Sequence, residues 1–159
     1  MISHPIPPVW YKNSKILILG SFPSVKSREE GFFYGHPRNR FWLVLSQLFE
    51  EPFPENINEK KKLLLTHKIA LWDVIASCEI TGSADSAIKT AVPNDISDII
   101  NTAKIKRIFL NGRTAASLYS RYMAETVNIE AVYLPSTSPA NASWTTEKLK
   151  KAWSEILNV

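Results

Sequence analysis

Short apolar runs alternate with longer amphipathic segments along the chain. Residues 15–21 predict a strand buried on both faces, because the apolar positions Ile16, Leu17, Ile18 and Leu19 are consecutive and do not alternate with polar ones. Further strands are predicted at residues 69–74, 107–110 and 129–134. Helices are predicted at residues 40–50, 58–67, 93–102, 112–124 and 145–157.

The predicted helices rest on spacing and on end signals. Phe41, Leu45 and Leu48 lie close to helical spacing, and prolines soon after residue 50 end that segment. Thr145 or Thr146 is a natural N-cap for the last helix. Four strands separated by helices predict an α/β fold of three layers, α/β/α, around a central, mainly parallel four-stranded sheet. No repeat or linker divides the chain, so residues 1–159 are expected to form a single domain.

Polar loops follow the predicted strands at one edge of the sheet. A parallel sheet binds its ligand outside the carboxyl ends of its strands. This rule is expected to bring together residues 21–39, 73–84, 111–113 and 135–141, which are rich in hydroxyl, amide and glycine residues. Such groups suit phosphate oxygens. The predicted crevice also holds aromatic side chains that could stack on a flat base, namely Phe22, Phe32, Phe33, Tyr34 and Trp72.

Composition narrows the class of protein. The chain has 159 residues, of which 45% are hydrophobic, so it can bury one core. A formal charge of +4 permits a polyanionic partner without requiring one. With Cys78 as the one cysteine, the chain can form neither an internal disulfide nor a four-cysteine zinc or iron–sulfur site, and we interpret Cys78 as a core residue. Because neither a signal-peptide pattern nor an apolar run of membrane length is present, we expect a soluble cytoplasmic protein.

Two motifs carry a resemblance to a known family. Residues 20–42, Gly-Ser-Phe-Pro-Ser through His-Pro-Arg-Asn-Arg-Phe-Trp, resemble the first motif of the uracil-DNA glycosylase superfamily, in the version found in the mismatch-specific uracil-DNA glycosylases. Residues 134–141, Leu-Pro-Ser-Thr-Ser-Pro-Ala-Asn, are similar to its second motif. The motifs occur in the expected order, and the resemblance implies a glycosylase that acts on a base flipped out of DNA.

One departure from the superfamily pattern points to a subgroup. Phe22 stands where most relatives carry the Asp or Asn that positions the attacking water. The Gly-Ser-Phe-Pro element followed by His-Pro-Arg-Asn-Arg-Phe-Trp resembles the hypoxanthine-DNA (deoxyinosine) glycosylase family. That resemblance implies a monofunctional enzyme of base excision repair, without metal, iron–sulfur cluster or other cofactor, and it places catalysis at Asn39. Uracil and xanthine remain alternative bases.

The chemistry of an amide at this position can be stated. The transition state of N-glycosidic hydrolysis carries positive charge on the sugar and negative charge on the departing base. Asn39 could hold a water through its carbonyl and donate through its NH₂ group, which positions the water without removing a proton. Alternatively, Asn39 is the N-cap of the helix that begins near Phe41.

The resemblance also implies a base-binding set. Its members are Ser21, Phe22, Pro23, Ser24, Tyr34, Asp73 and Asn111. Tyr34 would stack on the base, and Asp73 could accept a hydrogen bond from N1–H of hypoxanthine, while backbone N–H groups of the first loop face O6. Each side chain has a structural alternative: core packing for Tyr34 and Phe22, a solvated strand end or helix cap for Asp73, and packing against the Gly112 turn for Asn111.

A DNA-binding set is implied by the same motifs. Its members are His36, Arg38, Ser136, Ser138, Pro139, Ala140 and Asn141. Ser136 and Ser138 would grip phosphates, while residues 139–141 occupy the place of the wedge that fills the vacated stack. Ala140 is small where relatives often have Leu, so the enzyme is hypothesised either to depend on lesions that unstack readily or to accept single strands well. Arg38, like Arg40 and Arg113, is alternatively a surface residue, and His36 a loop anchor.

The expected partner is DNA that contains deaminated bases, bound by a monomer. Two other functions remain open. A nucleoside deoxyribosyltransferase would need a nucleophilic carboxylate, for which the first loop offers only Glu29 and Glu30. A non-catalytic module for damaged or single-stranded DNA would use the same stacking and phosphate contacts.

Overall fold

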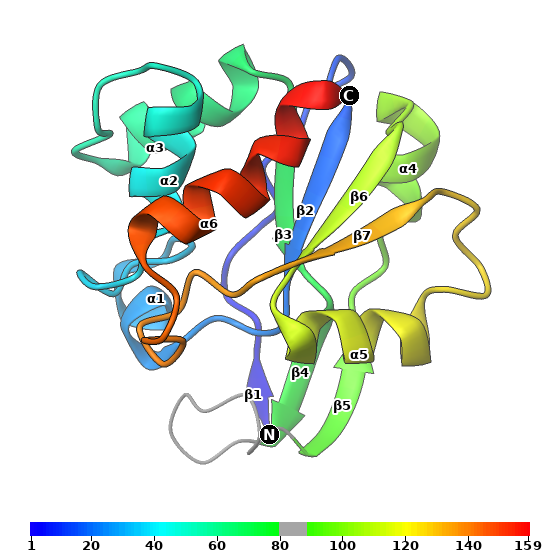
Figure 1. Ribbon diagram of the computed structural model, residues 1–159. Helices are drawn as coiled ribbons and strands as arrows, with labels where there is room; N and C mark the ends of the chain where they lie inside the picture. The colour runs from blue at the N-terminus through cyan, green and yellow to red at the C-terminus, as the bar shows by residue number, and fades with distance from the viewer. Residues whose placement is uncertain (80–88) are drawn as a thin grey trace.

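A parallel sheet of four strands forms the centre of the molecule. The computed structural model describes residues 1–79 and 89–159. In this sheet β2 (Ile16–Gly20) lies between β3 (Ile69–Asp73) and β6 (Arg107–Asn111), and β7 (Ala131–Leu134) pairs with β6, all in parallel (Figure 1). The predicted order of alternating strands and helices is therefore confirmed.

Helices cover both faces of the sheet, as Figure 1 shows. The first face carries α2 (Phe41–Leu48), α3 (Ile57–Thr66) and α6 (Thr146–Trp153), and the second carries α4 (Ser97–Ala103) and α5 (Arg113–Tyr122). Ile16 and Ile18 point into the first layer of core, while Leu17 and Leu19 point into the second. The consecutive apolar residues of β2 thus serve two cores, and the three-layer α/β/α prediction is confirmed.

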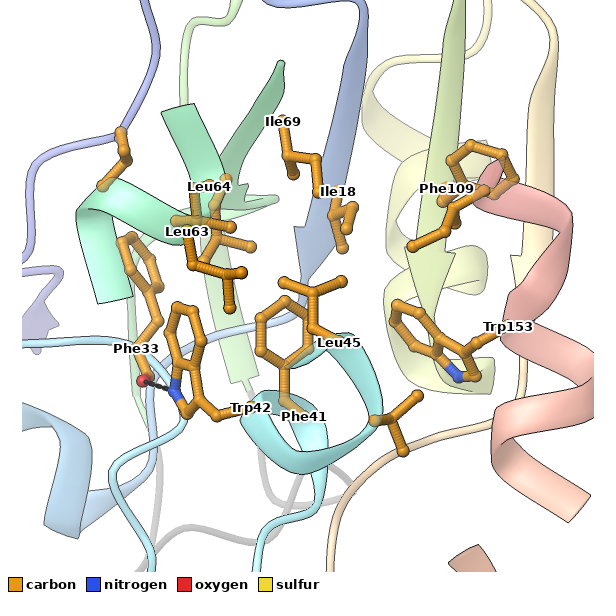
Figure 2. Packing of buried hydrophobic residues seen from close by; sticks show 14 of the residues in the cluster. Ile18, Phe33, Phe41, Trp42, Leu45, Leu63, Leu64, Ile69, Phe109 and Trp153 are labelled. Atoms are coloured by element: carbon orange, nitrogen blue, oxygen red, sulfur yellow. Dashed lines mark hydrogen bonds between the residues drawn. The ribbon is translucent and has the colours of Figure 1, made fainter. Parts of the chain in front are cut away.

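The first core is rich in large rings. Figure 2 shows Phe41, Trp42 and Leu45 of α2 packed together with Leu63 and Leu64 of α3, Trp153 of α6 and the sheet residues Ile18, Ile69 and Phe109. The indole N–H of Trp42 donates to the carbonyl of Phe33 at 3.0 Å, and that of Trp153 donates to the carbonyl of Pro135 at 2.9 Å. These two bonds tie both motif loops to the core.

Side-chain caps set where several helices begin. Thr145 accepts from Lys148 N at 3.1 Å, which confirms it as the N-cap of α6, one of the two capping candidates that the sequence offered for this helix. Asn56 caps α3 by accepting from Glu59 N at 2.9 Å, so this helix begins one residue before the predicted start. The last predicted helix continues beyond α6 as the 3₁₀ helix η2 (Ser154–Asn158).

A second, antiparallel sheet was absent from the sequence-based prediction. It contains β1 (Ile2–Ser3), β4 (Ile75–Glu79) and β5 (Lys89–Pro93), in the order β1-β4-β5. Residues 75–79, which were predicted as part of a crevice loop, therefore form a strand, and residues 80–84 lie outside the described residues. Pro93 ends β5 and does not open a helix; α4 begins four residues later, at Ser97.

The segment between residues 20 and 42 is also more ordered than a plain loop. It contains α1 (Val25–Glu30), whose N-cap Ser24 accepts from Ser27 N at 3.2 Å and whose C-cap Gly31 has φ +75°. Six residues are too few to produce a periodic apolar pattern, which is why this helix was not predicted. In the described part of the chain, no helix has both the length and the apolar character needed to cross a bilayer.

Leu45 is fully buried in the first core and offers a test of its packing. We expect Leu45→Ala to lower the free energy of unfolding by about 3 kcal/mol, because the lost side chain leaves a cavity among the surrounding rings. Urea denaturation followed by circular dichroism measures this loss. Leu157→Ala is the matched control. Because Leu157 is 46% exposed, losing its side chain should lower the free energy of unfolding by less than about 0.5 kcal/mol. Equal losses in the two variants would contradict the described core.

Candidate active site

A cleft of about 570 Å³ opens at the carboxyl ends of the four parallel strands. It is lined by residues from the first motif loop, the end of β3, the β6–α5 turn and the second motif loop. The predicted site residues that line it are Ser21, Phe22, Pro23, Ser24, Tyr34, Asn39, Asp73, Asn111, Ser136, Ser138, Ala140 and Asn141. Segments far apart in the sequence therefore meet at the carboxyl ends of the parallel strands, as the predicted sheet implied.

The first motif loop is held by its own serines. Ser24 Oγ caps α1, and Ser27 Oγ lies 3.2 Å from it and accepts from Gly35 N at 3.0 Å. Ser27 is buried, so this network fixes the return of the chain toward Tyr34. Ser24 thus has a structural role as a cap, while it also lines the cleft.

Tyr34 presents a ring that is supported from behind. Its backbone has φ +54°, in the left-handed region, and its ring stacks on Phe41 with centroids 4.2 Å apart and an interplanar angle of 22°. Phe41 is buried, so one face of Tyr34 is backed by core. An uncommon backbone conformation maintained by such stacking is typical of a binding position.

Asn39 is not the N-cap of α2, which is Arg40, but its side chain bonds to the first residue of that helix. Its Oδ1 accepts from Phe41 N at 3.0 Å at the start of α2, and the residue lines the cleft. The carbonyl oxygen has a second lone pair for a water, and the NH₂ group makes no hydrogen bond with any residue that the structure describes. This hydrogen bond therefore orients the amide and leaves it groups for a ligand.

Asn111 fastens the second motif loop to the sheet. Its Nδ2 donates to Thr137 Oγ1 and its Oδ1 accepts from Thr137 N, both at 3.1 Å. Thr137 is 1% exposed, so this paired contact is buried. Asn111 also lines the cleft, although both groups of its amide already have Thr137 as a partner. Its contact with a base stays a prediction.

The two predicted serines of this loop keep their hydroxyl protons available. Ser136 Oγ accepts from Ser138 N, and Ser138 Oγ accepts from Ala140 N, each at 3.1 Å. Because both oxygens act as acceptors from backbone, their O–H groups can point outward as donors. The side chain of Asn141 is engaged differently, with Nδ2 donating to Ser136 O at 3.0 Å.

Arg40 joins the two motif loops. Its guanidinium donates to the carbonyl of Trp144 and, at 3.2 Å, to the carbonyl of Asn141, while Arg40 N donates to Thr137 O at 3.1 Å. This side chain is therefore a clamp between the loops.

His36 and Arg38 do not line the cleft. Arg38 is exposed, and its backbone N–H donates to His36 Nδ1 at 3.0 Å. Pro139 also lies outside the lining.

The aromatic lining differs from the predicted set. Phe22, Phe33 and Tyr34 line the cleft, but Phe32 is buried and stacks on Trp42, and Trp72 donates its indole N–H to Ile6 O at 3.1 Å. Trp72 precedes Asp73 in β3, where successive side chains point to opposite faces, and Phe32 packs into the first core. Two aromatic residues that the sequence analysis missed, Tyr133 and Trp144, also line the cleft.

Asp73 lies at the base of the cleft, buried and in register with Gly20 of the neighbouring strand. Its Oδ2 lies 2.7 Å from Nε2 of His4, whose side chain is 3% exposed. Asp73 is therefore neither a solvated carboxylate nor a helix cap. His4 was missed because one histidine in a short N-terminal segment has no informative spacing, and only the pairing of β1 with β4 brings it here.

The titratable and metal-binding groups near the site are few. Cys78 is fully buried in the second core, and this burial raises the pKa of its thiol, as expected of a packing residue. Across the described ranges 1–79 and 89–159, no group of three or more His, Cys, Asp or Glu side chains could hold a metal ion. The cleft offers a ligand amides, hydroxyls, one buried carboxylate, aromatic faces and the guanidinium of Arg113.

The sheet and the cleft define an α/β protein that binds its ligand at the carboxyl ends of parallel strands. A family model described as the uracil DNA glycosylase superfamily matches residues 7–158. The chain belongs to this superfamily, and the resemblance that its two motifs indicated is confirmed.

Individual relatives agree with this membership. A protein of Methanosarcina acetivorans named hypoxanthine DNA glycosylase is 36% identical over 143 residues, which cover 89% of each chain. A protein of the same name from Methanosarcina barkeri is 34% identical over 152 residues, or 94% of each chain. The solution NMR structure of a candidate uracil DNA glycosylase from M. acetivorans aligns over 99% of each chain, with a TM-score of 0.80 and 33% identity.

Gly20 provides a test of the site geometry. A Cβ at this position would overlap Asp73 Oδ1 and lie 2.8 Å from Tyr34 Oη, so Gly20→Ala must displace one of these side chains. We expect at least a tenfold lower excision rate on a deoxyinosine oligonucleotide, because an ångström of misplacement is costly in a preorganised site. Single-turnover kinetics measures the rate.

Gly31→Ala is the matched control for this substitution. A Cβ on Gly31 would meet no atom within 4 Å, but its φ of +75° makes Ala unfavourable there. We expect this variant to lose about 1 kcal/mol of stability while it keeps the excision rate. Equal excision rates for Gly20→Ala and the unchanged protein would contradict the close approach of Asp73 and Tyr34.

Proposed function

We propose that this protein is a monofunctional DNA glycosylase of base excision repair that hydrolyses the N-glycosidic bond of a deaminated base, with hypoxanthine as the main substrate. The observation that carries the proposal is the meeting of both motif loops in one cleft, with Asn39 and Tyr34 among its lining residues. The names and the coverage of the Methanosarcina relatives support the choice of hypoxanthine.

In this mechanism the base enters the cleft and stacks on Tyr34. Phe41 supports the far face of that ring, so a bound base would complete a stack of three aromatic groups. Asp73 Oδ1 accepts from N1–H of the base. Backbone N–H groups of the first motif loop face O6, where negative charge accumulates as the bond breaks.

Asn39 positions the water that attacks the sugar. Its carbonyl, oriented by Phe41 N–H, accepts a hydrogen bond from the water through its second lone pair. An amide is too weak a base to remove a proton from the water, so the bond to the base must be largely broken before the water attacks. The proton that the water then loses passes to the departing base anion or to solvent. The enzyme therefore accelerates the reaction by holding the water and by stabilising the departing base.

The second motif loop binds the DNA backbone. The hydroxyls of Ser136 and Ser138 donate to phosphates beside the lesion, and Ala140 is exposed at the tip of the loop. Arg113, whose guanidinium lies 5.6 Å from the ring centroid of Tyr133, adds positive charge at the rim. His36 and Arg38 contact DNA from outside the cleft.

Neither alternative function gains support from the site. Glu29 and Glu30 are exposed near the end of α1 and do not line the cleft, so they are not placed as nucleophiles of a deoxyribosyltransferase. A purely DNA-binding module would not need the oriented amide of Asn39. The excision assay below separates an enzyme from such a module.

Asn39→Ala tests the catalytic role. We expect the excision rate on deoxyinosine DNA to fall by roughly a hundredfold, because the water loses its positioning group, while DNA affinity measured by fluorescence anisotropy stays within about threefold. Alkaline cleavage of abasic sites in labelled oligonucleotides reports excision. Asn101→Ala, at an exposed position on α4, is the matched control and should behave as the unchanged protein. Near-normal excision by Asn39→Ala would refute the proposed role.

The small side chain of Ala140 at the wedge position predicts that the excision rate depends on the stability of the base pair that contains the lesion. Because Ala140 cannot fill a vacated stack as Leu does, we expect faster excision from single-stranded and mismatched deoxyinosine substrates than from a well-paired duplex. The difference should be about tenfold, corresponding to part of the cost of opening a pair. Equal single-turnover rates on the three substrates would rule the idea out. Ala140→Leu should narrow the difference.

A further inference from the structure

The N-terminal segment reaches the underside of the cleft. β1 pairs antiparallel with β4 through Ile2↔Cys78 and Ser3↔Ser77, and His4 N donates to Ala76 O at 2.6 Å. Because β4 begins two residues after Asp73, this pairing places the backbone of His4 next to the end of β3. None of the residues before Gly20 belongs to either motif.

The imidazole of His4 is confined by aromatic rings. Phe22 meets it edge-on, with centroids 5.8 Å apart and an interplanar angle of 90°, and Phe33 and Trp72 lie at 6.0 and 6.3 Å. The side chain is 3% exposed, so it is shielded from solvent. A ring held in this way has one orientation relative to Asp73.

The hydrogen bonds of His4 define its tautomer. Nδ1 accepts from Ile6 N at 3.1 Å and therefore carries no proton, because two N–H groups would otherwise face each other. The ring is then neutral with its proton on Nε2, which donates to Asp73 Oδ2 at 2.7 Å. A backbone amide thus makes His4 an obligatory donor to Asp73.

This donor determines which oxygen of Asp73 meets a ligand. Oδ2 is occupied by His4, while Oδ1 and Tyr34 Oη both approach the Cα of Gly20, which lines the cleft. The backbone of Asp73 is fixed as well, since Asn94 Nδ2 donates to its carbonyl at 2.9 Å. The cleft therefore presents one carboxylate oxygen in a fixed place, and that oxygen only accepts hydrogen bonds.

We propose that His4 is a positioning residue for base selection, which holds Asp73 so that Oδ1 reads the ring N–H of a lactam base. The proposal rests on the glycosylase function above. Hypoxanthine presents N1–H and satisfies this oxygen, whereas its parent base adenine presents a lone pair at N1 and is repelled. The pair His4–Asp73 thus distinguishes the deaminated purine from the base that gave rise to it. Guanine also carries N1–H, so its rejection depends on the shape of the cleft.

His4 also moderates an electrostatic cost. Negative charge builds up on the departing base, and a buried carboxylate beside that base opposes this charge. A hydrogen bond from His4 withdraws charge from Asp73 toward Oδ2. The pair therefore acts mainly in recognition of the base and not in breaking the bond. For this reason the test measures the base selectivity of binding.

The test compares two bases in uncleavable DNA. Duplexes with 2′-fluoroarabino sugars carry either hypoxanthine or unsubstituted purine, which lacks both O6 and N1–H, and fluorescence anisotropy gives both dissociation constants. Their ratio is the base selectivity, and it cancels the fraction of folded protein in each preparation. We expect the unchanged protein to prefer hypoxanthine by more than about tenfold.

Two variants of His4 separate hydrogen bonding from packing. His4→Phe keeps a ring among Phe22, Phe33 and Trp72 but removes the donor, and should lower the selectivity about tenfold, as expected for one charge-assisted hydrogen bond. His4→Gln keeps an N–H donor near the place of Nε2 and should stay within about threefold of the unchanged protein. His67→Phe is the matched control, because His67 stacks on Phe49 at 4.1 Å and does not line the cleft.

Each outcome decides the proposal. An unchanged selectivity in His4→Phe overturns it, and a loss in His4→Gln alone would assign the effect to ring packing. An equal loss in both variants also overturns it, because the donor kept in His4→Gln would then fail to preserve the selectivity. A ratio near one in the unchanged protein overturns it without any variant. Excision of cleavable deoxyinosine DNA by the unchanged protein is measured in parallel: failure there rejects the glycosylase function, whereas excision with unaltered selectivity in His4→Phe rejects only the role of His4.

Discussion

The close approach of β2 and β3 at their carboxyl ends is the constraint on which the site depends. Gly20 is paired in register with Asp73, and because Gly20 has no side chain, the carboxylate of Asp73 and the phenol of Tyr34 can converge above its Cα. Parallel pairing alone would bring the strand ends together, but a Cβ at this one position would separate the groups. The first motif begins with glycine for this reason.

Several residues of the first motif support the fold and line the cleft at once. Ser24 caps α1, and Asn39 accepts from the first amide of α2. Such a hydrogen bond to the backbone at the start of a helix fixes the rotamer of a side chain, so it also fixes what that side chain presents to a ligand. Structural and catalytic interpretations of Asn39 are therefore compatible. The same holds for Tyr34, whose stacking on the core residue Phe41 leaves one face for the cleft.

The two motif loops act as one unit because polar contacts join them. Arg40 donates to carbonyls at the end of the second loop, and Asn111 pairs with Thr137 in its middle. Residues that a sequence reading assigns to phosphate or base contact thus hold the second loop against the first loop and against the sheet. A glycosylase that works by positioning a water and a base needs this rigidity, since it has no covalent intermediate to compensate for misplacement.

Local pattern in the sequence determined much of the protein: the four parallel strands, the three layers, the cap at Thr145 and the two motifs that indicate the superfamily. It did not predict α1 or β1, which are too short for periodicity, and it misplaced Phe32 and Trp72. Tertiary structure alone decided that Asp73 is buried against His4, that Arg40 is a clamp, and that Tyr133 and Trp144 line the cleft. Periodicity and caps act over a few residues, whereas these contacts join positions up to 104 residues apart, through pairings that no local spacing encodes.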